Sequence, residues 1–157
     1  MIMKRFRFLL GAAVVVLAFT AATPLFAQSN GNALVTVRSS HDYSTTLSNL
    51  QHAIKNDGLM ILGQVNQKSI ISMTGLNLKG AHSYLVGNPR VGKKLFSMSP
   101  AVAAVIPGRI SVWVQNGTTY VGYFQPSALM GMINSSLKSP GAMLDKKFQQ
   151  IVKGATQ

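Results

Sequence analysis

The stretch ISVWVQNGTTYVGYF, residues 110–124, predicts two antiparallel strands joined by a two-residue turn. Asn-Gly is a favoured sequence for such a turn, because both positions readily adopt a positive φ. A two-residue turn fixes the register of the strands, and successive side chains point to opposite faces. The turn pairs Gln115 with Thr118. Val112 is then expected opposite Val121 and Ile110 opposite Tyr123 on one face, with Trp113 opposite Tyr120 on the other face.

The aromatic side chains of this hairpin have two interpretations. Trp113, Tyr120 and Phe124 either line an apolar pocket or a dimer face, where large aromatic side chains are common, or pack beneath the helices that follow Pro126. The pattern alone leaves both interpretations open.

Further strands and helices are expected on either side of the hairpin. Leu47, Leu50 and Ile54 recur at helical spacing, Asp42 or Ser44 is placed to cap that helix, and a glycine at position 58 ends it. Strands are expected at 34–38, 59–66 and 83–87, short helices at 67–75 and 91–98, an apolar segment at 100–107, and two C-terminal helices within 127–153.

The element order is therefore β-α-β-α-β-α-β-β-α-α. This order predicts an α+β fold with two layers, in which a mostly antiparallel sheet carries helices on one face. Ser139-Pro140-Gly141 is expected to separate the two C-terminal helices, since proline and glycine disfavour a helix interior. The last helix is expected to bury Met143, Leu144, Phe148, Ile151 and Val152, and the spacing of Met130, Met132 and Met143 favours helix packing over a soft-metal site.

The N-terminus has the features of a secretory signal peptide. Basic residues precede the apolar run FLLGAAVVVLAF, and small residues follow it. We expect residues 1–27 to be cleaved, 28–33 to form a polar leader and 34–157 to form one domain, which places the protein in the periplasm or outside the cell. The alternative is a retained membrane anchor, because the apolar run approaches spanning length.

The chain is strongly basic and lacks cysteine. It contains 15 Lys and Arg against three Asp and no Glu, and removal of Lys4, Arg5 and Arg7 lowers the net charge from +12 to +9. Such an excess favours anionic partners, of which an envelope surface fits an exported protein better than nucleic acid does. Alternatively the charge only maintains solubility. Stability must come from burial, since no disulfide can form.

The segment GNPRVGKK, residues 87–94, differs by one letter from a phosphate-binding loop. Lys94 stands where that loop needs a Ser or Thr hydroxyl for Mg²⁺, and Pro89 lacks a backbone N–H, so nucleotide hydrolysis is not expected. The remaining expectation is an anion site at a helix N-terminus, and the alternative is an ordinary turn. Its candidate residues are Asn88, Arg90, Lys93 and Lys94, with His82 nearby.

No catalytic or metal-binding set of residues is evident. The histidines His41, His52 and His82 lack the spacing of convergent ligands, and there is no Cys or Glu to join them. No nucleophile motif accompanies the serines. We therefore expect no catalytic residues, no metal and no cofactor.

Several short motifs occur together in one order: KNDGL at 55–59, YLVGNPRVGKKLF at 84–96, a Pro-bounded segment at 100–107, ISVWV at 110–114 and YFQP at 123–126. With this set, residues 37–124 resemble the domain of unknown function 302 family. The resemblance implies a compact α+β domain similar to the TATA-binding-protein topology, often dimeric and without established activity. The chain departs from the family pattern at Asn66-Gln67, where members commonly carry Asp-His, and it has no His after residue 82, so a role of those histidines does not carry over.

These observations favour a non-catalytic module that binds a small, anionic ligand. The alternative is a basic, dimeric interaction protein that associates with the anionic envelope. A third interpretation is an enzyme that uses His82 or a Lys.

Overall fold

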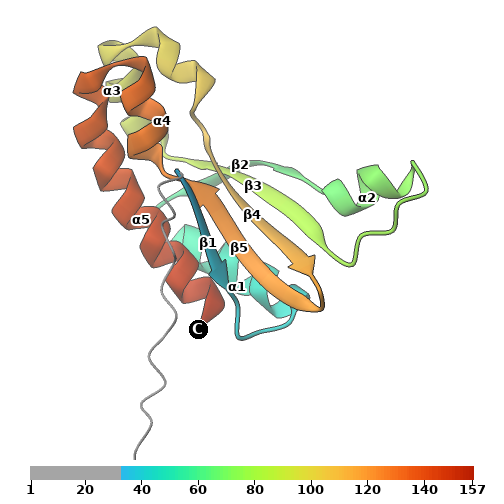
Figure 1. Ribbon diagram of the computed structural model, residues 1–157. Coiled ribbons are helices and arrows are strands. Elements are labelled where there is room, and N and C mark those ends of the chain that lie inside the picture. Colours follow the sequence, from blue (N-terminus) through green and yellow to red (C-terminus); the bar gives the residue numbers. More distant parts are fainter. Residues whose placement is uncertain (1–32) are drawn as a thin grey trace, which may run out of the picture.

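The computed structural model describes residues 33–157 (Figure 1). The expected signal peptide, and the leader except for Ala33, lie outside the described residues. The strands are β1 (Leu34–Arg38), β2 (Met60–Val65), β3 (Ala81–Gly87), β4 (Gly108–Gln115) and β5 (Thr118–Phe124). The helices are α1 (Tyr43–Asn56), α2 (Gln67–Ser72), α3 (Pro89–Met98), α4 (Pro126–Ile133) and α5 (Lys138–Thr156), with 3₁₀ turns η1 (Pro100–Ala104) and η2 (Ser135–Leu137).

The five strands form one antiparallel sheet in the order β1-β5-β4-β3-β2. The hairpin of β4 and β5 lies near its centre and has the register expected from the sequence, including Val112 opposite Val121 and Trp113 opposite Tyr120. Asn116 and Gly117 adopt φ values of 51° and 75°, as a tight hairpin turn requires. The predicted α+β fold with an antiparallel sheet is therefore confirmed.

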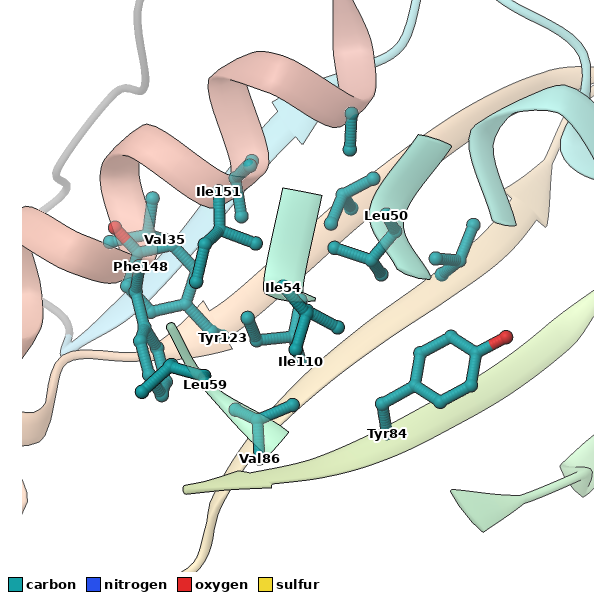
Figure 2. Packing of buried hydrophobic residues seen from close by; sticks show 14 residues of the cluster. Val35, Leu50, Ile54, Leu59, Tyr84, Val86, Ile110, Tyr123, Phe148 and Ile151 are labelled. Carbon is teal, nitrogen blue, oxygen red and sulfur yellow. The ribbon is translucent and has the colours of Figure 1, made fainter. Parts of the chain in front are cut away.

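Helices α1 and α5 cover one face of the sheet and form the main core with it (Figures 1 and 2). Side chains from the two helices meet the strands there, and the ring of Phe148 packs edge-on against Tyr123 at 5.3 Å. Burial of each large aliphatic side chain contributes about 1.5–3 kcal/mol. The cluster includes Leu50 and Ile54 of α1, Phe148, Ile151 and Val152 of α5, and Val35, Tyr84, Val86, Ile110, Val112, Val121 and Tyr123 of the strands.

A second, smaller core lies at the end of the sheet where β3 finishes. There α3, η1 and α4 gather beside α5 (Figure 1). Its buried members are Leu95, Val102, Met130 and Leu137, one from each of four short helical segments. With so few side chains, this second core holds α3 less firmly than the main core holds α1 and α5.

The three acidic residues of the chain and Gly58 lie at the ends of α1 or interact with the start of α4. Asp42 caps α1 by accepting the backbone N–H of Thr45 at 2.8 Å, and this bond lowers the pKa of its carboxyl. Gly58 follows α1 with a φ of 72°. Asp145 of α5 accepts the N–H of Ser127 at 3.0 Å and so places a negative charge at the start of α4. Asp57 is the C-cap residue that follows α1, and its backbone carbonyl accepts a hydrogen bond from the Lys147 ammonium.

Two expectations for the C-terminal helices are wrong. Ser139-Pro140-Gly141 does not separate them, because these residues lie in the first turn of α5, where the missing N–H of Pro140 would have no helical acceptor. The chain breaks instead at Asn134, which caps η2. Met132 and Met143 are also not packed inside, since 83% and 65% of their surfaces are exposed.

Gly141 allows α4 and α5 to cross closely. A Cβ at this position would lie 2.5 Å from the Cα of Ser127, so Gly141→Ala must push the two helices apart. We expect a loss of about 1–3 kcal/mol of unfolding free energy, measured by urea denaturation. The control is Gly131→Ala in α4, whose new Cβ would meet nothing closer than Lys138 at 3.8 Å. This control should gain about 0.5–1 kcal/mol, and equal losses in both variants would contradict the close crossing.

Tyr123 should make stability depend on pH in the alkaline range. Burial, and next the charge of Asp145, raise the pKa of Tyr123 to about 12 from 10.0. Because the unfolded chain loses this proton first, the contribution is complete below pH 10 and is lost as the pH rises toward 12. We expect the unfolding free energy of the wild type to fall more steeply than that of Tyr123→Phe between about pH 10 and pH 12. Parallel pH profiles would contradict this assignment.

Candidate functional site

An apolar pocket of about 370 Å³ lies beneath α3, at the end of the sheet. Its walls come from segments far apart in the sequence: the ends of β3 and β4, the residues around β2, and helices α3, α4 and α5. Apolar side chains dominate, with Leu59, Leu62, Val86, Leu95, Phe96 and Met130 among them. The main core and the second core meet at this pocket, and neither fills it.

Asn88 and Pro89 fix where α3 begins. Asn88 accepts the N–H of Arg90 at 2.9 Å and donates its amide to the carbonyl of Gly58 at 3.1 Å. The same side chain thus caps α3 and ties it to the end of α1. Pro89 occupies the first helical position, where its fixed φ suits the helix.

Gly92 leaves space beneath α3. It lines the pocket, and a Cβ built at this position would meet no atom within 4 Å. Glycine inside a helix costs about 0.5–1 kcal/mol relative to alanine, so its presence is not explained by helix stability. Because this position lines the pocket and is open, a larger side chain here would occupy space beside the pocket.

The pocket reaches solvent between side chains of β2 and α3. Leu62 is 50% exposed, Phe96 45% and Val91 36%, and all three line the pocket. Single exposed apolar residues are ordinary on a protein surface, whereas these three are grouped around one apolar cavity. The cavity is therefore accessible from outside.

The predicted anion-site residues are only partly brought together. Asn88 and Lys93 line the pocket, whereas Arg90 and Lys94 lie on exposed parts of α3 outside its lining. Pro89 has no N–H, and those of Arg90 and Gly92 are bonded to the side chain and the carbonyl of Asn88. Most of the backbone donors that an anion would use at this helix start are thus occupied.

His82 lies far from the pocket. It sits near the start of β3, and six residues of strand, about 20 Å, separate it from Asn88. Its ring packs on Tyr84 at 4.8 Å, and its Nε2 lies 3.3 Å from the side-chain oxygen of Gln64. Burial lowers the pKa of His82. Within residues 33–157 there is no group of three His or Asp residues that could hold a metal ion.

Trp113, Tyr120 and Phe124 of the hairpin lie on the sheet face opposite α1 and α5. Trp113 stacks on Tyr120 at 5.8 Å and covers Gly122, where a Cβ would come within 2.8 Å of the indole ring. Phe124 is 53% exposed and pairs with Leu34, which is 41% exposed. These side chains do not pack beneath α4 and α5, since register places them on the other face.

Sequence reasoning did not identify the pocket. Gly92 and Phe96 were expected within a short helix at 91–98, and Leu62 within a strand at 59–66, and none of the three was assigned to a ligand site. A usable signal was present in α3, where Val91 and Leu95 are spaced to share one helix face and Gly92 lies in the helix between them. No helix in the described part of the chain is both long and apolar enough to cross a membrane.

Comparison with known proteins gives one family. The structure is similar to the crystal structure of an uncharacterized conserved DUF302 protein from Bacillus stearothermophilus, with a TM-score of 0.73 and 25% sequence identity over 78% of this chain and 97% of the other. No curated protein matches the sequence. The model of the family described as domain of unknown function DUF302 matches residues 35–154, which extends the resemblance into α5. The chain belongs to the DUF302 family.

Proposed function

We propose that this protein is a non-catalytic binding module whose ligand has a largely apolar body and occupies the pocket beneath α3. One observation supports this proposal above all: the cavity is apolar, reaches solvent and remains unfilled at Gly92. Its volume of about 370 Å³ falls within the range of small-ligand sites, which is about 300–1,000 Å³.

Three prolines support a preformed pocket. Pro89, Pro107 and Pro126 all line it and restrict the backbone at the starts of α3 and α4 and just before β4. A rigid wall cannot collapse onto the empty space, so less free energy is needed to organise the site when a ligand binds. The sequence predicts an anion site at the start of α3. That site is not part of this proposal, because most of the backbone N–H groups there are already bonded.

Gly92→Leu should abolish binding and leave the fold intact. Decanol, a neutral ten-carbon alcohol, should raise the thermal unfolding temperature of the wild type, because a ligand that binds only the folded state stabilises it. A leucine at position 92 would fill the space beneath the helix, so decanol should no longer have an effect. Without ligand the variant should be more stable by about 0.5–1 kcal/mol.

Gly92→Ala is the matched control for that experiment. It gives the same gain in helix stability but adds only one methyl group to the cavity, so most of the decanol response should remain. A Gly92→Leu variant that binds decanol as tightly as the wild type would place the ligand elsewhere.

A second candidate function is dimerisation through the open face of the sheet. The exposed side chains of Leu34 and Phe124 lie opposite each other on the same face as the Trp113–Tyr120 stack, and none of these four belongs to either core cluster. A second copy would bury this apolar strip in a symmetric interface. The strong positive charge would then favour association of the dimer with an anionic envelope surface. No contact within the described residues favours an enzyme that uses His82 or a Lys.

Phe124→Arg should produce a monomer if this face is the dimer interface. The guanidinium would lie opposite an apolar neighbour and lose its hydration in the interface. The control is Met132→Arg, which changes an 83% exposed side chain on α4 and leaves the sheet unaltered. Native mass spectrometry should show dimers for the wild type and the control, and a monomeric wild type would refute this interface.

A further inference from the structure

We propose that the ligand of this pocket is an amphiphile, with a hydrocarbon body of about ten to twelve carbons in the cavity and one anionic group bound by Lys93 at its mouth. This inference rests on the proposed function and adds the chemical class of the ligand. It follows from the charge of the lining, the state of its polar side chains and the volume of the cavity.

Lys93 is the one charged side chain among the residues that line the pocket. Within residues 33–157 it makes no ion pair and no hydrogen bond. The three acids of the chain do not neutralise it, because Asp42 and Asp145 cap helices and Asp57 does not pair with it. An uncompensated ammonium at the rim of an apolar cavity is suited to bind an anion.

The neighbours of Lys93 on α3 have the same sign. Arg90 and Lys94 are exposed, and α3 contains no acidic residue. Their charges add to a positive potential at the pocket mouth, which raises the local concentration of an anionic ligand. A positively charged amphiphile would be repelled at the same place.

The anionic group must remain at the mouth. Asn88 is the one uncharged polar side chain in the lining, and both ends of its amide are already bonded within the protein. A polar group carried deeper would lose its hydration and find no side-chain partner, which opposes binding. A ligand with polar groups along its whole length, such as a sugar or a nucleotide, does not fit this cavity.

The volume sets the size of the apolar body. At about 30 Å³ for each water-sized group, a cavity of 370 Å³ holds roughly a dozen methylene-sized groups. Each additional buried methylene should tighten binding about fourfold, until the chain fills the cavity. Affinity should therefore rise from hexanoate to decanoate and level off beyond about twelve carbons.

Three ligands with the same ten-carbon chain test the head group: decanoate, decanol and decyltrimethylammonium. Dissociation constants are measured with the full-length protein at low ionic strength, below the micellar range. We expect decanoate to bind about three- to tenfold more tightly than decanol, and decyltrimethylammonium more weakly than both. Added salt should reduce the difference, since screening weakens the contact with the ammonium.

Lys93→Gln should remove the preference for decanoate and retain the binding of decanol. Lys94→Gln is the matched control, because it removes the same charge from the adjacent position outside the pocket lining. It should retain most of the preference. If Lys93→Gln still prefers decanoate, or if Lys94→Gln loses the preference to the same extent, Lys93 is not the anion partner and the inference is wrong.

The outcomes separate this inference from the function beneath it. If none of the three compounds binds the wild type, the pocket is not a ligand site and both proposals fail. If decanol binds as tightly as decanoate, the binding function stands and the anionic head group is refuted. Vesicles of phosphatidylglycerol identify the source of the amphiphile. If the vesicles compete with decanoate, the ligand is a membrane lipid, and if decanoate binds but the vesicles do not, the ligand is a free acid. Either result supports an anionic amphiphile as the ligand.

Discussion

The two-residue turn at Asn116-Gly117 fixes which side chains of the central strands face the helices. Because side chains alternate along a strand, a shift of one residue would exchange the two faces of the sheet. Val112 and Val121 would then meet solvent, and the Trp113–Tyr120 stack would lie under α1 and α5. The main core, the open aromatic face and the end of the sheet where the pocket forms all depend on this register.

The pocket exists because α3 does not complete the packing of its own end of the sheet. Leu95 is its one buried side chain, and Gly92 leaves empty the space that a larger residue would fill. A helix with better intrinsic stability would have no glycine at this position. Sites that bind ligands often retain such a deficit, because residues that stabilise the fold would occupy the site.

Local features of the fold could be predicted from the sequence, and the site could be predicted only in part. The hairpin register, the cap at Asp42 and the end of α1 at Gly58 each depend on a few adjacent residues. Lys93 and Lys94 are indistinguishable in the sequence, yet only the first lines the pocket, since the rotation of α3 against its neighbours decides this. Asn88 was expected at a ligand site and lines the pocket, but its amide is already bonded to Arg90 and Gly58.

The sequence by itself determined the alternation of the strands, the tight turn, the helix caps and the excess of positive charge, because propensity, capping and composition act within a few residues or over the whole chain. The tertiary structure alone decided that residues from Leu59 to Phe148 surround one cavity and that His82 lies at the other end of β3. The physical reason is that a cavity depends on how separate elements are placed in space. Packing between distant segments determines that placement, and spacing along the chain does not record it.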